Sequence, residues 1–264
     1  EGGRFSSNSF KINLVPGRYH FSFAAGAIAR ESLYVNGLPA ILNITGNFSR
    51  EQFEMDIPDG LAEITLDGKA GTSFELSALE IKKIADQKTI PPTIWLGGDS
   101  TVCNYYPIEP VNKESITGWG QVLPFYLTND YILRNYATSG QTTKGFREDG
   151  AFDAILAQIK PGEYFIVQLG INDRNKYPLA DFRANLEYFV DQIRAKGGIP
   201  VLVTPQGRSD GFKLDPWNNL THGVSGWAGH YDMIRIVARE KNTLLIDNAN
   251  LSSAYYVSIG EEAT

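Results

Sequence analysis

The hydrophobic periodicity of this 264-residue chain changes near residue 90, and this change limits the folds that the chain can adopt. Over residues 1–85, apolar and polar residues alternate with a period of two, and turn-forming residues recur about every 8–12 positions. This pattern is typical of an all-β sandwich. The alternation is clearest in six segments: residues 10–15, 18–23, 32–37, 53–60, 62–68 and 74–81.

Residues 86–92 are polar and end in Pro91-Pro92, which predicts a short, stiff linker. From Thr93 onward, apolar segments of strand length alternate with amphipathic segments of helix length. Repeated βα units predict a parallel sheet with helices on both faces, so we expect an α/β domain over residues 93–264. The expected strands cover residues 93–97, 131–137, 164–169, 200–204 and 243–247. The expected helices cover residues 118–127, 145–159, 179–196 and 228–241, and a last helix begins near Asn250.

The composition narrows the possible functions. The net charge of −6 and the lack of a basic stripe argue against a nucleic-acid partner. Apolar runs such as residues 200–204 are far too short to span a bilayer, which argues against a membrane partner. A single cysteine, Cys103, excludes an internal disulfide framework and a cysteine-based zinc site. Cys103 could act as a nucleophile, but no surrounding pattern supports this, and a half-buried filler role is preferred.

A serine follows the first strand of the α/β half, in the segment from Trp95 to Thr101. The apolar run ends at two glycines and is followed by Asp99-Ser100. In an open α/β sheet, ligands and chemistry gather at the carboxyl ends of the strands. Ser100 is therefore placed to act as a nucleophile.

Two further strand ends carry residues suited to bind an anion. Gly140 follows the second expected strand, and a glycine there allows a backbone N–H to point into a site. Asn172 follows the third. In the flavodoxin-like strand order 2-1-3-4-5 these ends are neighbours, so a hydroxyl, a backbone N–H and a side-chain amide would meet, as acyl transfer requires. Each feature alone has a simpler explanation, a turn or a helix cap, and only the combination favours a site.

These motifs resemble a known family. Gly98-Asp99-Ser100, Gly140 and Gly170-x-Asn172-Asp173 are similar to the first three blocks of the SGNH (GDSL-type) hydrolases. A longer set of segments resembles the rhamnogalacturonan acetylesterase branch, a carbohydrate esterase family 12-like group: residues 98–102, 118–121 and 135–137. The resemblance implies a flavodoxin-like three-layer α/β/α domain, preceded here by a jelly-roll sandwich of the galactose-binding-like type.

The resemblance also implies roles for individual residues. Ser100 is the expected nucleophile. The N–H groups of Ser100 and Gly140 and the amide of Asn172 form the expected oxyanion hole. Asp99 holds the nucleophile turn together, and Asp173 supports the site. The family uses no metal and no organic cofactor, so none is expected.

The family's general base is a histidine in an Asp-x-x-His motif, and no such motif occurs in these 264 residues. The three histidines are His20, His222 and His230. His20 lies in an alternating segment and is expected to be structural or exposed. For His222 we prefer loop structure or substrate contact over a role as base. We expect the Asp-x-x-His block to lie beyond Thr264, so that the domain is truncated before it.

The sequence therefore predicts a serine esterase that removes acetyl groups from pectic polysaccharide such as rhamnogalacturonan. Its partner would be an acetylated polysaccharide or oligosaccharide, met in a secreted or extracytoplasmic location. The alternative is a catalytically incomplete carbohydrate-binding protein of the same fold, because a serine without a base is a poor nucleophile.

Overall fold

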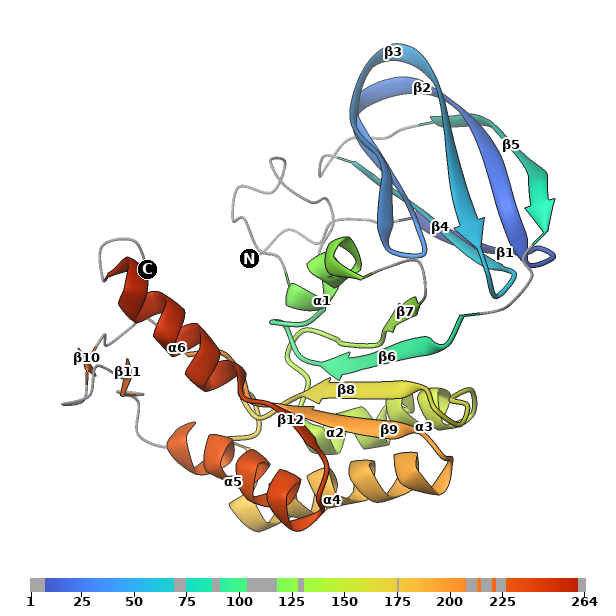
Figure 1. Cartoon of the computed structure of the whole chain (residues 1–264). Helices are drawn as coiled ribbons and strands as arrows, with labels where there is room; N and C mark the ends of the chain where they lie inside the picture. The colour runs from blue at the N-terminus through green and yellow to red at the C-terminus, as the bar shows by residue number, and fades with distance from the viewer. Residues whose placement is uncertain are drawn as a thin grey trace. The chain divides into compact units, whose positions relative to one another are not determined.

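The chain divides into two compact units, one formed by residues 1–92 with 104–132 and one by residues 93–103 with 133–264. The structure is a computed structural model, shown in Figure 1. The predicted linker lies partly outside its described residues, and the domain boundary there stays a prediction. The described residues are 8–68, 75–86, 91–103, 118–127, 131–174, 176–207, 213–214, 220–221 and 227–260.

The first unit contains five antiparallel strands, as the alternating pattern predicts. They pair in the order β1-β4-β2-β3, and β5 also pairs with β2. One edge of β2 pairs with β5 over Gly17–Gly26 and with β4 over Glu31–Val35. The strands are β1 (Asn8–Asn13), β2 (Gly17–Val35), β3 (Leu38–Ile57), β4 (Leu61–Gly68) and β5 (Glu75–Asp86).

Both halves of the long strand β2 contribute to one core. Phe21 from its first half and Leu33 from its second half are buried together with Ile64 of β4. The sequence predicts two separate strands here, over residues 18–23 and 32–37, whereas the structure joins them. Register shifts between Ile28 and Tyr34 bend the strand without interrupting its pairing, which is how β-bulges act.

The second unit contains a five-stranded sheet in the order β12-β9-β8-β6-β7. Numbered along the chain, this is the predicted order 2-1-3-4-5, read from the other edge. The pairs β6–β8, β8–β9 and β9–β12 are parallel. The strands are β6 (Thr93–Gly98), β7 (Ile132–Asn135), β8 (Tyr164–Gln168), β9 (Ile199–Val203) and β12 (Leu244–Ile246), and a short separate pair is formed by β10 (Lys213–Leu214) and β11 (Leu220–Thr221).

The helices follow the predicted segments with two differences. The segment 145–159 forms two helices because Gly150 between them has φ +85°, in the left-handed region. The segment 118–127 forms a short α-helix and then a 3₁₀-helix, with Pro124 at the junction. The helices are α1 (Trp119–Val122), η1 (Leu123–Tyr126), α2 (Thr143–Glu148), α3 (Ala151–Leu156), α4 (Leu179–Ala195), α5 (Trp227–Glu240) and α6 (Asn248–Ile259).

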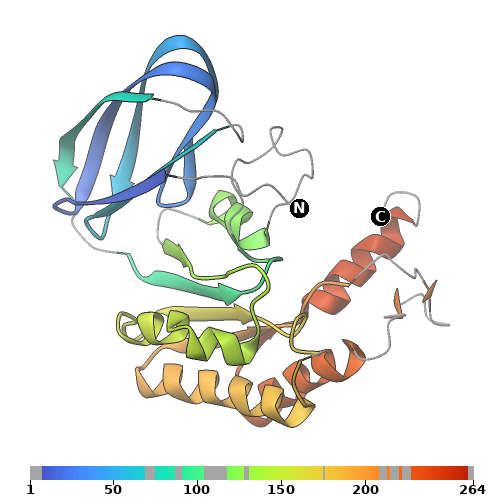
Figure 2. The same cartoon turned by 180° about the vertical axis from the view of Figure 1, so that it is seen from behind.

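Helices α2 to α5 pack on one face of the parallel sheet (Figure 1). Figure 2 shows the same arrangement turned by 180°. The centre of this core is a group of buried aromatic rings, with Phe146 of α2, Phe152 of α3 and Phe189 of α4 around Phe165 of β8. Such rings bury large apolar areas and fix the helices against the strands. Among the described residues, the helices include none that is both long and apolar enough to cross a membrane.

Candidate active site

The three predicted strand ends are neighbours in the structure. Ser100 follows β6, Gly140 follows β7 and Asn172 follows β8, and these strands are adjacent in the order β8-β6-β7. The loops after β7 and β8 are joined directly, because Asn172 Nδ2 donates to the carbonyl oxygen of Gln141 at 2.9 Å. The predicted placement of these residues at one edge is therefore found, while their catalytic roles stay predictions.

The turn that carries Ser100 is held by Asp99. The Asp99 side chain is fully buried, and its Oδ1 accepts from Thr101 N at 2.9 Å and from Thr101 Oγ1 at 2.8 Å. Its backbone carbonyl accepts from the N–H groups of Val102 and Cys103, each at 3.0 Å. Asp99 therefore bonds within the turn that carries Ser100, and its role in the site stays a prediction. Ser100 itself is half-buried.

The two glycines before Asp99 are required by packing. A Cβ on Gly97 would lie 2.7 Å from the ring of Phe146, and a Cβ on Gly98 would lie 2.5 Å from a methyl group of Val102. Both glycines belong to β6, so they bring the strand close to its neighbours.

Burial raises the pKa of the Asp99 carboxyl above its ordinary value. The hydrogen bonds from Thr101 act in the opposite direction, and the nearby carboxylate of Asp173 raises the pKa further. Within the described part of the chain, Asp99 Oδ2 has no hydrogen-bond partner. The turn that carries Ser100 therefore depends on a carboxyl group whose ionisation is disfavoured by burial.

Gly140 needs to be a glycine because of its backbone conformation. Its φ is +78°, and a Cβ there would meet nothing within 4 Å. After it, Thr142 Oγ1 accepts from Gly145 N at 3.0 Å and caps the start of α2. The cap fixes the direction in which the chain leaves the loop.

Asp173 is bound to the start of α2. Its side chain is fully buried and accepts from Thr143 Oγ1 at 2.6 Å and from Thr143 N at 2.9 Å. Burial raises the pKa of the Asp173 carboxyl, while the bonds from Thr143 and the proximity of His230 lower it. Asp173 thus connects the loop after β8 to the helix after β7, and its supporting role in the site stays a prediction.

Two buried polar residues at this edge were missed at the sequence level. Gln168 ends β8, is fully buried, and its Nε2 donates to Thr101 Oγ1 at 2.5 Å. Its Oε1 accepts from Asn248 Nδ2 at 3.5 Å, which links the turn that carries Ser100 to the start of α6. A glutamine inside an otherwise apolar strand was the signal that could have found it. The second buried polar residue is Thr143, at the start of α2.

The histidines take different positions. His230 lies inside α5, is buried, and packs on Phe182 with ring centroids 4.8 Å apart and ring planes tilted by 54°. It falls within the segment 228–241, which the sequence predicts to be helical. His20 is half-buried in β2, with its Nε2 at 3.4 Å from Ser22 Oγ. His222, the possible substrate contact, lies outside the described residues.

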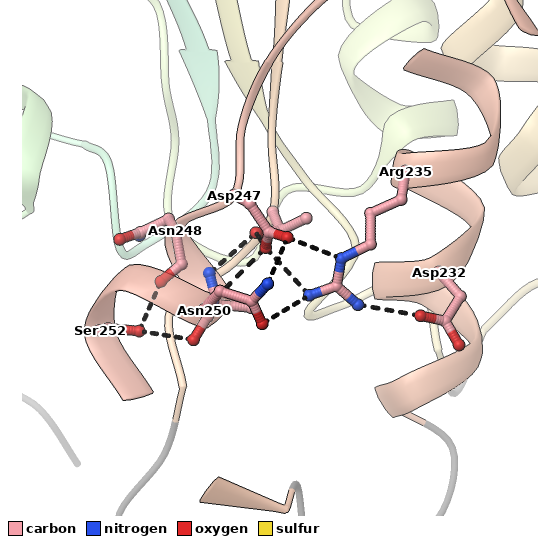
Figure 3. Close-up of polar contacts among 8 residues, drawn as sticks. Asp232, Arg235, Asp247, Asn248, Asn250 and Ser252 are labelled. Carbon is pink, nitrogen blue, oxygen red and sulfur yellow. Dashed lines mark hydrogen bonds and ion pairs between the residues drawn. The ribbon is translucent and has the colours of Figure 1, made fainter. Parts of the chain in front are cut away.

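Helix α6 starts at the same edge and is anchored by Asp247 (Figure 3). Asp247 accepts from Arg235 Nε and Nη2 of α5, each at 2.9 Å, and from Thr204 Oγ1 at 3.0 Å. Burial raises the pKa of Asp247, but the hydrogen bonds and charge of Arg235 outweigh it, so the pKa lies below its ordinary value. In the described ranges, no three or more His, Cys, Asp or Glu side chains are grouped to hold a metal ion.

Two family comparisons cover most of the chain. Residues 1–82 match the galactose-binding-like domain of the beta-agarase/YXIM esterase-like proteins. Residues 97–258 match the GDSL-like lipase/acylhydrolase family. The predicted resemblance and fold class are thereby confirmed, for both the parallel-sheet domain and the β-rich domain before it.

Individual relatives are esterases by name. The chain is 43% identical over 267 residues to the uncharacterized esterase YxiM of Bacillus subtilis, covering 99% of this chain and 68% of YxiM. It is 32% identical over 176 residues to the rhamnogalacturonan acetylesterase RhgT of the same organism, covering 65% of this chain and 71% of RhgT. The crystal structure of the YxiM protein superposes with a TM-score of 0.62 at 41% identity, over 97% of this chain and 72% of that one.

Proposed function

Because the chain belongs to the GDSL-like lipase/acylhydrolase family of carboxylic ester hydrolases, we propose that it removes acetyl groups from pectic polysaccharide such as rhamnogalacturonan. The observation that carries the proposal is the meeting of three strand ends, with Ser100 beside the loops of Gly140 and Asn172. The relative RhgT, a rhamnogalacturonan acetylesterase, supports the choice of substrate. Such a polymer would be met outside the cytoplasm, so the proposal includes secretion.

In the proposed mechanism, Ser100 Oγ attacks the carbonyl carbon of the acetyl group. The N–H groups of Ser100 and Gly140 and the amide of Asn172 then donate to the oxygen on which negative charge develops. The sugar hydroxyl leaves, and water releases acetate from the acyl-serine. Asn172 Nδ2, now bound to Gln141 O, would turn toward the oxyanion or share its second hydrogen with it.

The mechanism also needs a base that takes the proton from Ser100. The family resemblance assigns this role to a histidine of an Asp-x-x-His motif, which these 264 residues do not contain. Activity is therefore to be measured on the protein expressed from its complete gene. A base that is missing there as well would leave only the residual catalysis of oxyanion donors and binding, about 10³–10⁴-fold over water.

The test is acetate release from acetylated rhamnogalacturonan and from 4-nitrophenyl acetate. Ser100→Ala is expected to lower kcat by about 10³-fold or more, since the nucleophile is removed. Cys103→Ala is the matched control, because Cys103 is the other candidate nucleophile in the same turn. The proposal is contradicted if Ser100→Ala retains its activity, and also if only Cys103→Ala loses about 10³-fold in kcat.

A second candidate is a carbohydrate-binding protein of the same fold without catalysis. The match of residues 1–82 to a galactose-binding-like domain favours it, together with the lack of an Asp-x-x-His motif. A protein from the complete gene that binds the polysaccharide but releases no acetate would support this candidate and exclude the esterase.

A further inference from the structure

The segment after β7 and the loop after β8, which both contribute to the proposed oxyanion hole, are connected by hydrogen bonds at two adjacent positions. Asn172 Nδ2 donates to Gln141 O at 2.9 Å, and the next residue, Asp173, accepts from both the N–H and the hydroxyl of Thr143. Any shift of Thr143 against Asp173 would therefore also shift the Asn172 amide against the loop that follows Gly140. The Thr143–Asp173 contact thus lies next to the Gln141–Asn172 contact and joins the same two segments.

This contact is stronger when Asp173 is charged. Thr143 N and Thr143 Oγ1 both donate to Asp173 Oδ1, and Thr143 N also lies 3.2 Å from Oδ2, so both donors bind more strongly to a negatively charged acceptor. Asp173 is fully buried, and the titratable groups that face it are Asp99 from the turn after β6 and His230 from α5. Burial disfavours the charge of Asp173, and the donors from Thr143 act against this effect.

A chain of hydrogen bonds from Arg147 through Asn185 to Thr143, called the relay below, determines where the Thr143 hydroxyl points. Asn185 Nδ2 of α4 donates to Thr143 Oγ1 at 3.2 Å, and Arg147 Nη1 of α2 donates to Asn185 Oδ1 at 2.8 Å. An arginine can only donate, so Asn185 must turn its oxygen to Arg147 and its NH₂ to Thr143. Thr143 has one hydroxyl hydrogen, and with Asn185 occupying an acceptor position this hydrogen goes to Asp173, at 2.6 Å.

Arg147 is held in place from the solvent side. Its guanidinium lies 3.9 Å from the ring centroid of Tyr188, a cation–π contact on α4. Arg147, Asn185 and Tyr188 line a surface cavity of about 470 Å³ between the helices. The relay therefore runs from an exposed cation to a buried carboxylate.

We infer that Thr143 is a positioning residue of this enzyme, directed by Asn185 and Arg147, that holds Asp173 and thereby sets the geometry of the oxyanion hole. The inference rests on the proposed esterase function. It assigns no contact with substrate to any of the three residues. Their effect is expected on the rate of the chemical step and not on substrate binding.

The test is Thr143→Val, which removes the hydroxyl and keeps the shape of the side chain. We expect kcat on 4-nitrophenyl acetate to fall about tenfold to a hundredfold with KM within about twofold, because a small misplacement of the donors weakens only the transition state. Losing a donor to the charged form raises the pKa of Asp173, so the acidic fall of kcat moves to higher pH. Thr143→Ser restores the hydroxyl and is expected to recover both kcat and the pH profile.

A second pair of variants lies on the surface, where folding is not at risk. Arg147→Met is expected to lower kcat severalfold and to shift the pH profile in the same direction. Lys144→Met removes an equal charge from the same helix outside the relay and is expected to change neither. The inference is overturned if Arg147→Met and folded Thr143→Val both keep the kcat and the pH profile of the wild type. In that case the esterase proposal still stands, as long as Ser100→Ala is inactive. An inactive wild-type protein from the complete gene overturns both.

Discussion

At the scale of single residues, the edge of the parallel sheet carries two carboxyl groups whose ionisation is disfavoured by burial. Asp99 and Asp173 are both fully buried, and burial raises the pKa of each carboxyl. Cores normally exclude such groups unless they are well bonded. Their retention beside Ser100 fits a site in which hydrogen-bond geometry matters more than stability.

The raised pKa of Asp99 predicts a pH dependence of stability. Its contribution is fully present below the unfolded-state pKa of 3.8 and is lost as pH rises through the higher folded pKa, because the buried group must then ionise. Asp99→Asn does not ionise. We therefore expect the free energy of unfolding of the variant to increase relative to wild type as pH rises from about 4 to 8.

Urea unfolding at several pH values and constant ionic strength measures this difference. Asparagine can still accept from Thr101 through its oxygen, so any cost of its unbonded NH₂ is the same at every pH. Only the slope against pH reports the ionisation. A difference between variant and wild type that does not change with pH would show that Asp99 is not the titrating group.

At the scale of secondary-structure elements, α6 depends on one ion pair for its start (Figure 3). Asp247 and Asp232 both contact Arg235 at 2.9 Å, but the Asp247 side chain is 25% exposed and that of Asp232 is 63% exposed. Asp247 also caps the helix and accepts from Thr204. The two carboxylates therefore make the same contact with Arg235 at the same distance but differ in solvent exposure, so each serves as a control for the other.

We expect Asp247→Asn to lower the free energy of unfolding by about 2 kcal/mol at pH 7 and Asp232→Asn by less than about 1 kcal/mol. The folded pKa of Asp247 is lowered, so its contribution is present above 3.8 and is lost as pH falls through the folded pKa. Chemical denaturation at pH 7 and in acid checks both statements. Equal costs for the two variants at pH 7 would mean that burial and capping add nothing at Asp247.

The order of the parallel strands and the loop positions of Ser100, Gly140 and Asn172 could be predicted from the sequence. The loop positions depend on hydrophobic runs and on glycines at strand ends, both of which are local signals. The strand order was taken from the flavodoxin-like arrangement of doubly wound sheets and not from a local signal. The continuity of β2 could not, because bulges let a strand bend through residues that otherwise indicate a turn.

The residues that support the site were also hidden from the sequence. Thr143 and Asn185 are polar residues within helices, and residues of these types are mostly exposed in proteins. They become buried because α2 and α4 pack together over the sheet, and only that packing brings them to Asp173. Their role depends on contacts between elements that are 30 to 42 positions apart, which no local pattern encodes.

At the scale of the whole molecule, each unit has a core built from its own residues. The core around Phe21 contains residues from 19 to 66, and the core around Phe189 contains Trp95 and residues from 146 to 238. The two rings are each fully buried, and each contacts other aromatic rings. Truncating either to alanine removes a similar volume from a different core.

We therefore expect Phe21→Ala and Phe189→Ala each to cost about 3–5 kcal/mol, but in different units. Phe189→Ala should lower the temperature at which esterase activity is lost, since α4 also carries Asn185. Phe21→Ala should leave that temperature unchanged and instead make residues 1–92 more sensitive to protease. Thermal inactivation and limited proteolysis of both variants measure the two effects. If Phe21→Ala lowers the inactivation temperature as much as Phe189→Ala does, the two cores unfold as one cooperative unit and the esterase depends on the β-rich unit for its stability.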